Sequence, residues 1–242
     1  MRLPDFLGIG TQKGGTTYLH ALLQYHPQIF LATPKEQHFF SLHWQRGEQW
    51  YADQFALAES HQCCGEVTPY YLFHPEVPQR IKSQLPDVKL IVLLRDPVER
   101  ALSQYFHSRR LGLEPLELEA AFAAEPQRLA DAAEQLAAGK PHRSHQQHSY
   151  LSRSRYEQQI ARYEELFKPE QLLMLRSEQL FAKPAAVLEQ VLKFLSLDSM
   201  RFPPLDPVYT SAGEAADVSE AFKQVLRQQL EPTYRWLEEF RL

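Results

Sequence analysis

Short apolar runs alternate with longer amphipathic segments along this chain, a pattern typical of proteins that layer helices on a sheet. The run KLIVLL at 89–94 is apolar almost throughout, as expected of a parallel strand that is covered on both faces. Alternating strands and helices therefore predict an α/β fold with a mostly parallel central sheet flanked by helices. The segments that we expect to be strands are 6–10, 29–32, 63–68, 89–94 and 172–175.

Apolar residues at helical spacing predict helices between these strands. In the clearest case Tyr156, Ile160 and Tyr163 fall on one face. The expected helices are 16–25, 98–110 and 155–167.

The stretch 114–139 departs from this alternation, because it is rich in Ala, Glu and Gln and carries Pro115 and Pro126 as helix breakers. We expect one or two surface helices there, within an insertion at about 114–150 that is either a lid or a solvated helical excursion. The 242 residues suffice for one sizeable core, so we expect 1–242 to form a single domain.

The charge balance narrows the range of partners. Lys and Arg total 26 against 30 Asp and Glu, a net charge of -4, so no global basic field favours nucleic acid or an acidic membrane.

The amino terminus does not resemble a secretory signal, and no apolar run is long enough to span a membrane. Cys63 and Cys64 are adjacent and cannot build a framework of long-range disulfides. We expect a cytoplasmic protein; the pattern holds no signal for an oligomeric state.

The stretch FLGIGTQKGGTT carries the first candidate chemistry. A glycine loop between a strand and a helix presents free backbone N–H groups and the positive end of the helix dipole to an anion. Residues 10–17 have the spacing of the nucleotide loop G-x-x-x-x-G-K-[ST], except that Thr16 occupies the lysine position and Lys13 stands earlier. The loop therefore predicts a phosphate site, with a tight turn that binds no ligand as the alternative.

The strand at 89–94 ends in LLRDP, which bears on the kind of ligand. ATPases and GTPases need an acidic residue after a later strand to help hold magnesium. Here Arg95 stands at the strand tip, with Asp96 just beyond it. A guanidinium favours phosphate. We therefore expect a ligand with phosphates at two separated points, one at the glycine loop and one near Arg95, rather than a metal-bound triphosphate.

Four motifs in order, GTQKGGTTYLHALLQYHPQI, KEQHFF, GEVTPYYL and IVLLRDPVERALSQYFHSRR, resemble the sulfotransferases that use 3'-phosphoadenosine 5'-phosphosulfate (PAPS). The similarity is greatest to the heparan-sulfate and bacterial small-molecule branch, and it implies a P-loop-like sulfotransferase fold and a reaction that requires no metal. By this resemblance the glycine loop holds the 5'-phosphosulfate, while Arg95 and Ser103 hold the 3'-phosphate. The loop residues that take this role are Lys13, Gly14, Gly15, Thr16 and Thr17.

Sulfuryl transfer needs a base for the acceptor proton and positive charge near the oxygens that gain charge. Lys13 is the candidate for the charge. Glu36 and His38 are two residues apart in PKEQHFF, so in an extended segment they project to the same side. The resemblance favours Glu36 as the base, with His38 assisting or binding acceptor, although a histidine serves in other branches.

Two neighbouring features bear on the role of Glu36. We expect burial near Phe39 and Phe40 to raise its pKa, which would suit a base. The alternative is a solvated pair of Lys35 and Glu36 that precedes a core aromatic stretch.

Glu66, in GEVTPYYL, lies at an expected strand end, where sites of α/β proteins gather. It either binds acceptor, orients Lys13, or caps the segment that begins near Thr68. Val67 follows it where related enzymes often have a basic residue. Aromatic residues nearby suit a carbohydrate, lipid, carrier-bound acyl or small-molecule acceptor, and the choice between hydroxyl and amine stays open. These pocket candidates are Phe39, Phe40, Tyr70 and Tyr71, with the insertion.

The segment from Tyr150 also belongs to the resemblance. By that resemblance it closes over nucleotide and acceptor, with Arg153 and Tyr156 as candidate acceptor contacts. The alternative for Arg153 and its neighbour Arg155 is that both are ordinary solvated charges. The preceding PHRSHQQHSY carries three histidines, His142, His145 and His148, and we interpret it as a mobile loop beside the acceptor entrance; a zinc site is the less favoured alternative.

One stretch departs from the family pattern. Enzymes of the family usually wrap the nucleotide with a basic glycine-containing loop, but YTSAGEAADVSEAF has one glycine and no Lys or Arg before Lys223. Tyr209, Thr210 and Ser211 remain as candidate hydrogen-bond donors. The main hypothesis is a PAPS-dependent sulfotransferase. A nucleotide-binding scaffold without transfer activity and a P-loop nucleotide kinase or NTPase are the alternatives.

Overall fold

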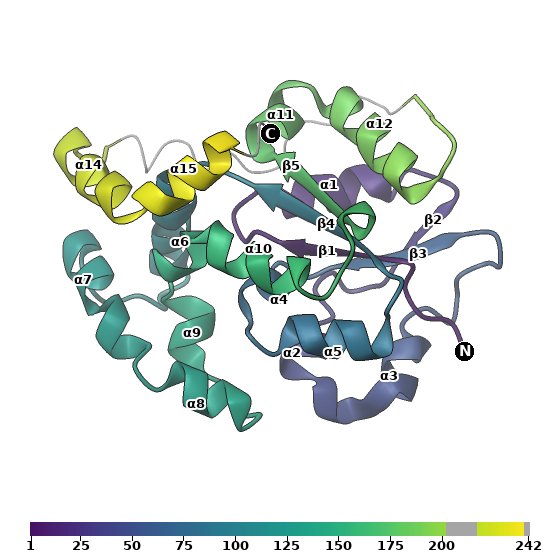
Figure 1. Ribbon diagram of the computed structural model, residues 1–242, viewed down its shortest axis with the longest axis horizontal. Coiled ribbons are helices and arrows are strands. Elements are labelled where there is room, and N and C mark those ends of the chain that lie inside the picture. The colour runs from purple at the N-terminus through teal and green to yellow at the C-terminus, as the bar shows by residue number, and fades with distance from the viewer. Residues whose placement is uncertain (202–216, 240–242) are drawn as a thin grey trace. The chain divides into compact units, whose positions relative to one another are not determined.

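The computed structural model describes residues 1–201 and 217–239 (Figure 1). These residues form two compact units, 1–94 with 162–201 and 95–161 with 217–239. The single domain over 1–242 stays a prediction. The three donors expected at 209–211 lie outside the described residues.

The first unit is built on a sheet of five parallel strands in the order β2-β3-β1-β4-β5. This confirms the predicted α/β class, and each strand lies within one residue of its expected bounds. β1 is central, with Phe6 aligned with Gly65 of β3 on one side and with Lys89 of β4 on the other. The strands are β1 Phe6–Gly10, β2 Ile29–Leu31, β3 Cys63–Val67, β4 Lys89–Leu94 and β5 Leu172–Arg176.

Helices cover both faces of this sheet, with α1, α11 and α12 on one side and α2, α4 and α5 on the other (Figure 1). On the first side Leu19 and Leu23, one turn apart on α1, pack with Ile91 of β4 and Val191 of α12 in one core cluster. The helices of this unit are α1 Thr16–Leu23, α2 Phe39–Leu42, α3 Gly47–Asp53, α4 Tyr70–Phe73, α5 Val77–Gln84, α11 Ser177–Ala182 and α12 Pro184–Leu195.

The second unit is helical. α6 begins where the Asp96 carboxylate caps it by accepting the backbone N–H of Glu99 at 2.9 Å. The expectation that Pro126 breaks a helix was wrong: α7 runs through it to Arg128. The proline removes one N–H bond to the preceding turn, and only two helical residues follow it. The helices are α6 Pro97–Arg110, α7 Leu118–Arg128, α8 Ala132–Ala137, α9 Arg143–Gln147, α14 Glu220–Gln229 and α15 Glu231–Glu239, while α10 Tyr156–Glu164 begins here and ends in the first unit.

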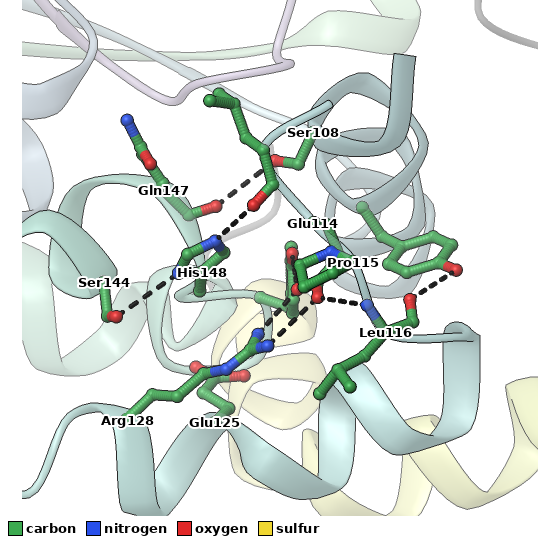
Figure 2. A network of polar contacts seen from close by, with 12 residues as sticks. Ser108, Glu114, Pro115, Leu116, Glu125, Arg128, Ser144, Gln147 and His148 are labelled. Atoms are coloured by element: carbon green, nitrogen blue, oxygen red, sulfur yellow. Dashed lines mark hydrogen bonds and ion pairs between the residues drawn. The ribbon is translucent and has the colours of Figure 1, made fainter. Parts of the chain in front are cut away.

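The histidine-rich stretch is ordered, which corrects the expected mobile loop. His142 caps α9 by accepting the N–H of His145 on Nδ1 at 2.9 Å, and its Nε2 meets Asp131 at 2.9 Å. His148 Nε2 bonds the carbonyl of Leu113 at 3.1 Å (Figure 2). All three histidines are buried, and the rings of His142 and His148 have these structural roles.

The buried carboxylate of Glu114 bonds to residues from several parts of the segment 114–150 (Figure 2). Glu114 accepts two bonds from the Arg128 guanidinium, at 2.6 and 3.0 Å, one from the Tyr150 hydroxyl at 2.7 Å and one from the Leu116 N–H at 2.9 Å. Burial disfavours its charge, but the bond from Arg128 and then that from Tyr150 outweigh burial and lower its pKa to about 2. Glu114 is therefore a structural anion.

Candidate functional site

The glycine loop has the backbone form of an anion cradle. Gly15 has φ 89°, a left-handed conformation that glycine adopts without steric cost, and α1 begins at the next residue. A Cβ on Gly14 would lie 2.9 Å from the Leu93 carbonyl oxygen, so only glycine fits there. The first turn of α1 carries no acidic side chain to compete with an anion.

Strained backbone marks the predicted catalytic residues. Among the residues that the structure describes, four that are not glycine have positive φ: Lys13 at 67°, Glu36 at 67°, His38 at 54° and Ser196 at 62°. Such conformations cost about 1 kcal/mol or more each and cluster at functional sites. Ser196 is the C-cap of α12, which accounts for it. The other three are the residues that the sequence places in catalysis.

Glu36 and His38 are brought together as expected, with Oε2 of Glu36 3.4 Å from Nε2 of His38. Lys35 Nζ lies 2.7 Å from Oε1 of Glu36, so the predicted alternative pair also forms. His38 Nδ1 meets the Ser41 hydroxyl at 3.1 Å. Glu36 therefore has a cation on one oxygen and an imidazole on the other.

The expected rise in the Glu36 pKa is wrong. Burial does oppose its charge, but the bond with His38 and then the charge of Lys35 outweigh burial and lower the pKa to about 2. Phe39, one of the two aromatic residues expected near Glu36, stacks on Tyr51 at 4.2 Å between ring centroids. Glu36 is thus ionised at neutral pH, with its charge facing Lys35 and His38.

Sequence reasoning missed His20, which lies on α1 one turn after Thr16. Its side chain is buried, and its Nε2 has no hydrogen-bond partner among the described residues. Burial, and then the charge of Lys35, lower its pKa to about 4, while Glu36 acts in the opposite direction. The charges of Lys35 and Glu36 therefore act on α1 as well as on each other. The spacing of four residues from Thr16 was the only signal in the sequence.

The Glu66 carboxylate is buried, and each of its two oxygens accepts two hydrogen bonds. Oε1 accepts the hydroxyls of Tyr51 at 2.6 Å and Tyr71 at 2.8 Å. Oε2 accepts the Thr68 hydroxyl at 2.7 Å and the backbone N–H of Gln37 at 3.2 Å. Burial raises its pKa, although the three hydroxyls lower it in part. The expected cap does not form, because the N-cap of α4 is Pro69, without a side-chain cap bond, and Glu66 accepts the Thr68 hydroxyl instead. The bond to the segment of Glu36 was not foreseen.

The two predicted aromatic acceptor contacts differ in their surroundings. Phe39 is 1% exposed and packs among Phe40, Trp44 and Tyr51. Tyr70 is buried and lies edge-on to the His38 ring, at 6.2 Å between centroids. Tyr70 is thus the one of the two that borders a catalytic candidate.

The second unit holds the remaining predicted residues. The Tyr156 hydroxyl donates to the Arg95 carbonyl at 3.0 Å, which ties α10 to the start of α6. Ser103 lies buried on α6, on a helix as expected. Arg153 is 1% exposed, and its guanidinium donates to the carbonyls of His145 and Gln146 at 2.8 and 2.9 Å. The alternative of a solvated charge is therefore wrong for Arg153.

A second buried arginine in this unit was not foreseen. Arg100 is fully buried on α6, and its guanidinium donates to Ser154 Oγ at 2.6 Å, to Gln104 Oε1 at 2.8 Å and to the Tyr150 carbonyl. Burial lowers its pKa to about 10. Arg100 thus fixes the segment 150–154 to α6.

Among residues 1–201 and 217–239, no cluster of three or more His, Cys, Asp or Glu side chains could hold a metal ion. No helix in the same part of the chain is both long and apolar enough to cross a bilayer.

Comparison with protein-family models matches residues 3–207 to the sulfotransferase domain. Over 207 residues, 81% of this chain, it is 34% identical to the human bifunctional heparan sulfate N-deacetylase/N-sulfotransferase 3. Over 109 residues, 44% of this chain, it is 46% identical to the membrane-associated sulfotransferase kil1 of Dictyostelium discoideum. The matched segments make up 22% and 23% of those relatives, so the chain spans about a quarter of their length.

Solved structures give the same result. The sulfotransferase from Alicyclobacillus acidocaldarius is 26% identical, with a TM-score of 0.71 over 96% of each chain. Mouse sulfotransferase SULT7A1, solved with PAP, is 18% identical, with a TM-score of 0.53 over 83% of this chain and 62% of its own. The second likeness is one of fold, and it agrees with the predicted P-loop-like architecture.

Proposed function

Because the chain belongs to the sulfotransferase family, we propose that it transfers a sulfuryl group from PAPS to a hydroxyl or amine and releases 3'-phosphoadenosine 5'-phosphate (PAP). The observation that carries this proposal is the strained backbone at Lys13, Glu36 and His38. Strain persists only where the surrounding structure enforces it. These three residues are also those that the sequence motifs assign to the chemistry.

The donor binds through its two phosphate groups. The backbone N–H groups of the loop and of the first turn of α1 hold the 5'-phosphosulfate, and glycine at 14 and 15 lets them approach it. Lys13 neutralises the bridging oxygen that gains charge as the S–O bond breaks. Arg95 and Ser103 hold the 3'-phosphate. The PAP bound to SULT7A1 supports this choice of donor.

Glu36 and His38 handle the acceptor proton. The acceptor oxygen or nitrogen attacks sulfur, its bond to hydrogen breaks, and the proton passes to this pair while the electron pair of the breaking S–O bond stays on the nucleotide. Glu36 is ionised and so can accept the proton, and His38, 3.4 Å away, shares it. The low pKa makes Glu36 alone a weak base, which favours the pair over either residue.

A carbohydrate is the first acceptor class to test, because the N-sulfotransferase relative is named for heparan sulfate. Val67 follows Glu66 where related enzymes often carry a basic residue, so the acceptor contacts differ from those of a typical glycosaminoglycan enzyme. Lipid and small-molecule alcohols are the further classes in an acceptor screen. A cytoplasmic location stays a prediction.

Calorimetric titration with PAP, beside ATP with magnesium, tests the proposed function in wild type and Arg95→Ala. Selective binding of PAP that Arg95→Ala weakens supports the donor assignment and justifies an acceptor screen with PAPS. Preference for magnesium ATP would favour a nucleotide kinase or NTPase instead. PAP binding without sulfate transfer to any acceptor class would favour a nucleotide-binding scaffold.

A further inference from the structure

Two backbone amides of the segment that carries Glu36 and His38 are tied to the motif GEVTPYYL. The N–H of Gln37 donates to Oε2 of Glu66 at 3.2 Å. The N–H of Phe40 donates to the Tyr71 hydroxyl at 3.3 Å, and that hydroxyl donates to Oε1 of Glu66 at 2.8 Å. Both ties therefore end on one carboxylate at the carboxyl end of β3.

The position of Gln37 gives the first tie its significance. Gln37 is buried between Glu36 and His38, which both have left-handed backbone, at φ 67° and 54°. Left-handed backbone at two residues so close together is unfavourable on its own, so surrounding contacts must hold the segment in this conformation. The bond from the Gln37 amide to a buried acceptor supplies that anchor at the middle of the strained run.

Stability alone does not explain a carboxylate at this point. Glu66 is 1% exposed, and burying a carboxylate carries a desolvation cost that its hydrogen bonds at best offset. A purely apolar cluster at this point, with the donors replaced as well, would avoid that cost. The carboxylate can instead accept four donors from four directions, and those donors come from α3, α4, the end of β3 and the segment of Glu36.

We propose that Glu66 is a positioning residue, which holds Glu36 and His38 in place through the Gln37 amide directly and through Tyr71 and the Phe40 amide indirectly. The role rests on the proposed function, because positioning matters only if those two residues act on the acceptor. This positioning role takes the place of acceptor contact, one of the roles that the sequence allowed for Glu66, because its two oxygens already accept four bonds. It also explains why the motifs KEQHFF and GEVTPYYL occur together.

Two tyrosines allow a matched test. Tyr51 and Tyr71 are both fully buried, and each donates its hydroxyl to Oε1 of Glu66, but the acceptor for the Phe40 amide is Tyr71. Tyr51→Phe and Tyr71→Phe thus remove the same group from the same carboxylate oxygen. Glu66→Gln, the third variant, keeps the shape but places an amide N–H against donors.

The variants are compared by kcat, by PAP affinity and by hydrogen exchange of the 37 and 40 amides. Tyr71→Phe is expected to lower kcat by about 10²-fold, the size of effect that a misplacement of about 1 Å produces. PAP affinity stays at the wild-type value. Exchange quickens at Phe40 in Tyr71→Phe and at Gln37 in Glu66→Gln. Tyr51→Phe is expected to keep wild-type exchange at both amides and a kcat near that of wild type.

Equal losses of kcat in the two tyrosine variants would overturn the proposal, because both then act only through the stability of the carboxylate. Unchanged exchange at Gln37 in Glu66→Gln would overturn it as well. The exchange measurement needs no acceptor and no turnover. If wild type binds PAP but transfers no sulfate, the proposed function fails, while the exchange rates still decide whether Glu66 anchors the segment.

Discussion

Replacing Glu114 with Gln is expected to destabilise the protein by about 3 kcal/mol at pH 7. The variant leaves the Arg128 guanidinium without its anion, and breaking a buried pair from one side costs about 3 to 5 kcal/mol. The lower value applies because the Arg128 side chain is 19% exposed, whereas that of Glu114 is 0% exposed. The fall of the Glu114 pKa from 4.5 to about 2 gives a second estimate, also about 3 kcal/mol.

The same pKa fixes the pH dependence of this stabilisation. The folded pKa lies below the unfolded one, so the contribution is complete above about pH 4.5 and is lost as the pH falls toward 2. Glu114→Gln lacks this dependence. The difference in unfolding free energy between wild type and variant is therefore expected to shrink from pH 7 to pH 3.

Urea denaturation followed by circular dichroism at both pH values measures these differences. Glu117→Gln is the matched control, because Glu117 also pairs with an arginine, Arg109 at 2.9 Å, but its side chain is 84% exposed. A pair so exposed contributes no more than about 1 kcal/mol. If Glu114→Gln costs no more than Glu117→Gln, or if its effect does not depend on pH, the reasoning from burial and pKa fails.

Three further changes test the first unit. Glu36→Gln should lower kcat by about 10² to 10⁴-fold with PAP affinity nearly unchanged, as for loss of a general base, and normal turnover would remove Glu36 from that role. Gly15→Ala should weaken PAP binding about tenfold in calorimetry, because φ at Gly15 is 89° and the added Cβ would lie 2.9 Å from the Phe181 ring. Gly47→Ala is the control: φ at Gly47 is 80°, but the added Cβ would have no atom within 4 Å, and PAP binding should not change. Wild type is expected to lose up to about 3 kcal/mol of stability as the pH falls from 6.5 to about 4, because the unfolded state binds the His20 proton more tightly. His20→Leu should abolish this loss; thermal melts across that range show it, and an unchanged slope would contradict it.

The sheet was predictable because its signal is local. A run such as KLIVLL is covered on both faces, and its apolar composition records that without reference to the rest of the chain. The loop and its glycines were predictable for a similar reason, since spacing alone sets their geometry.

The electrostatics of the site were not predictable, because they depend on where side chains turn. Phe39 follows Glu36 closely in the sequence, but its ring packs against Tyr51, while Lys35 and His38 set the Glu36 pKa. The anchor on Glu66 joins Gln37 to a residue 29 positions later. No pattern within one segment records such a contact, and the buried histidines of the second unit were misread for the same reason.

The strand order also governs how the chain is made. β1 is synthesised before the other four strands but lies at the centre of the sheet. β4, at 89–94, pairs on its outer edge with β5, at 172–176. At a synthesis rate of about 5 to 20 residues per second, that edge waits about 4 to 16 s for its partner. A bare apolar strand edge recruits other chains during such a delay. Association between incomplete chains competes with completion of the sheet. The yield of folded protein should therefore rise when this association is slowed more than synthesis is, as in expression at low temperature and low template dose.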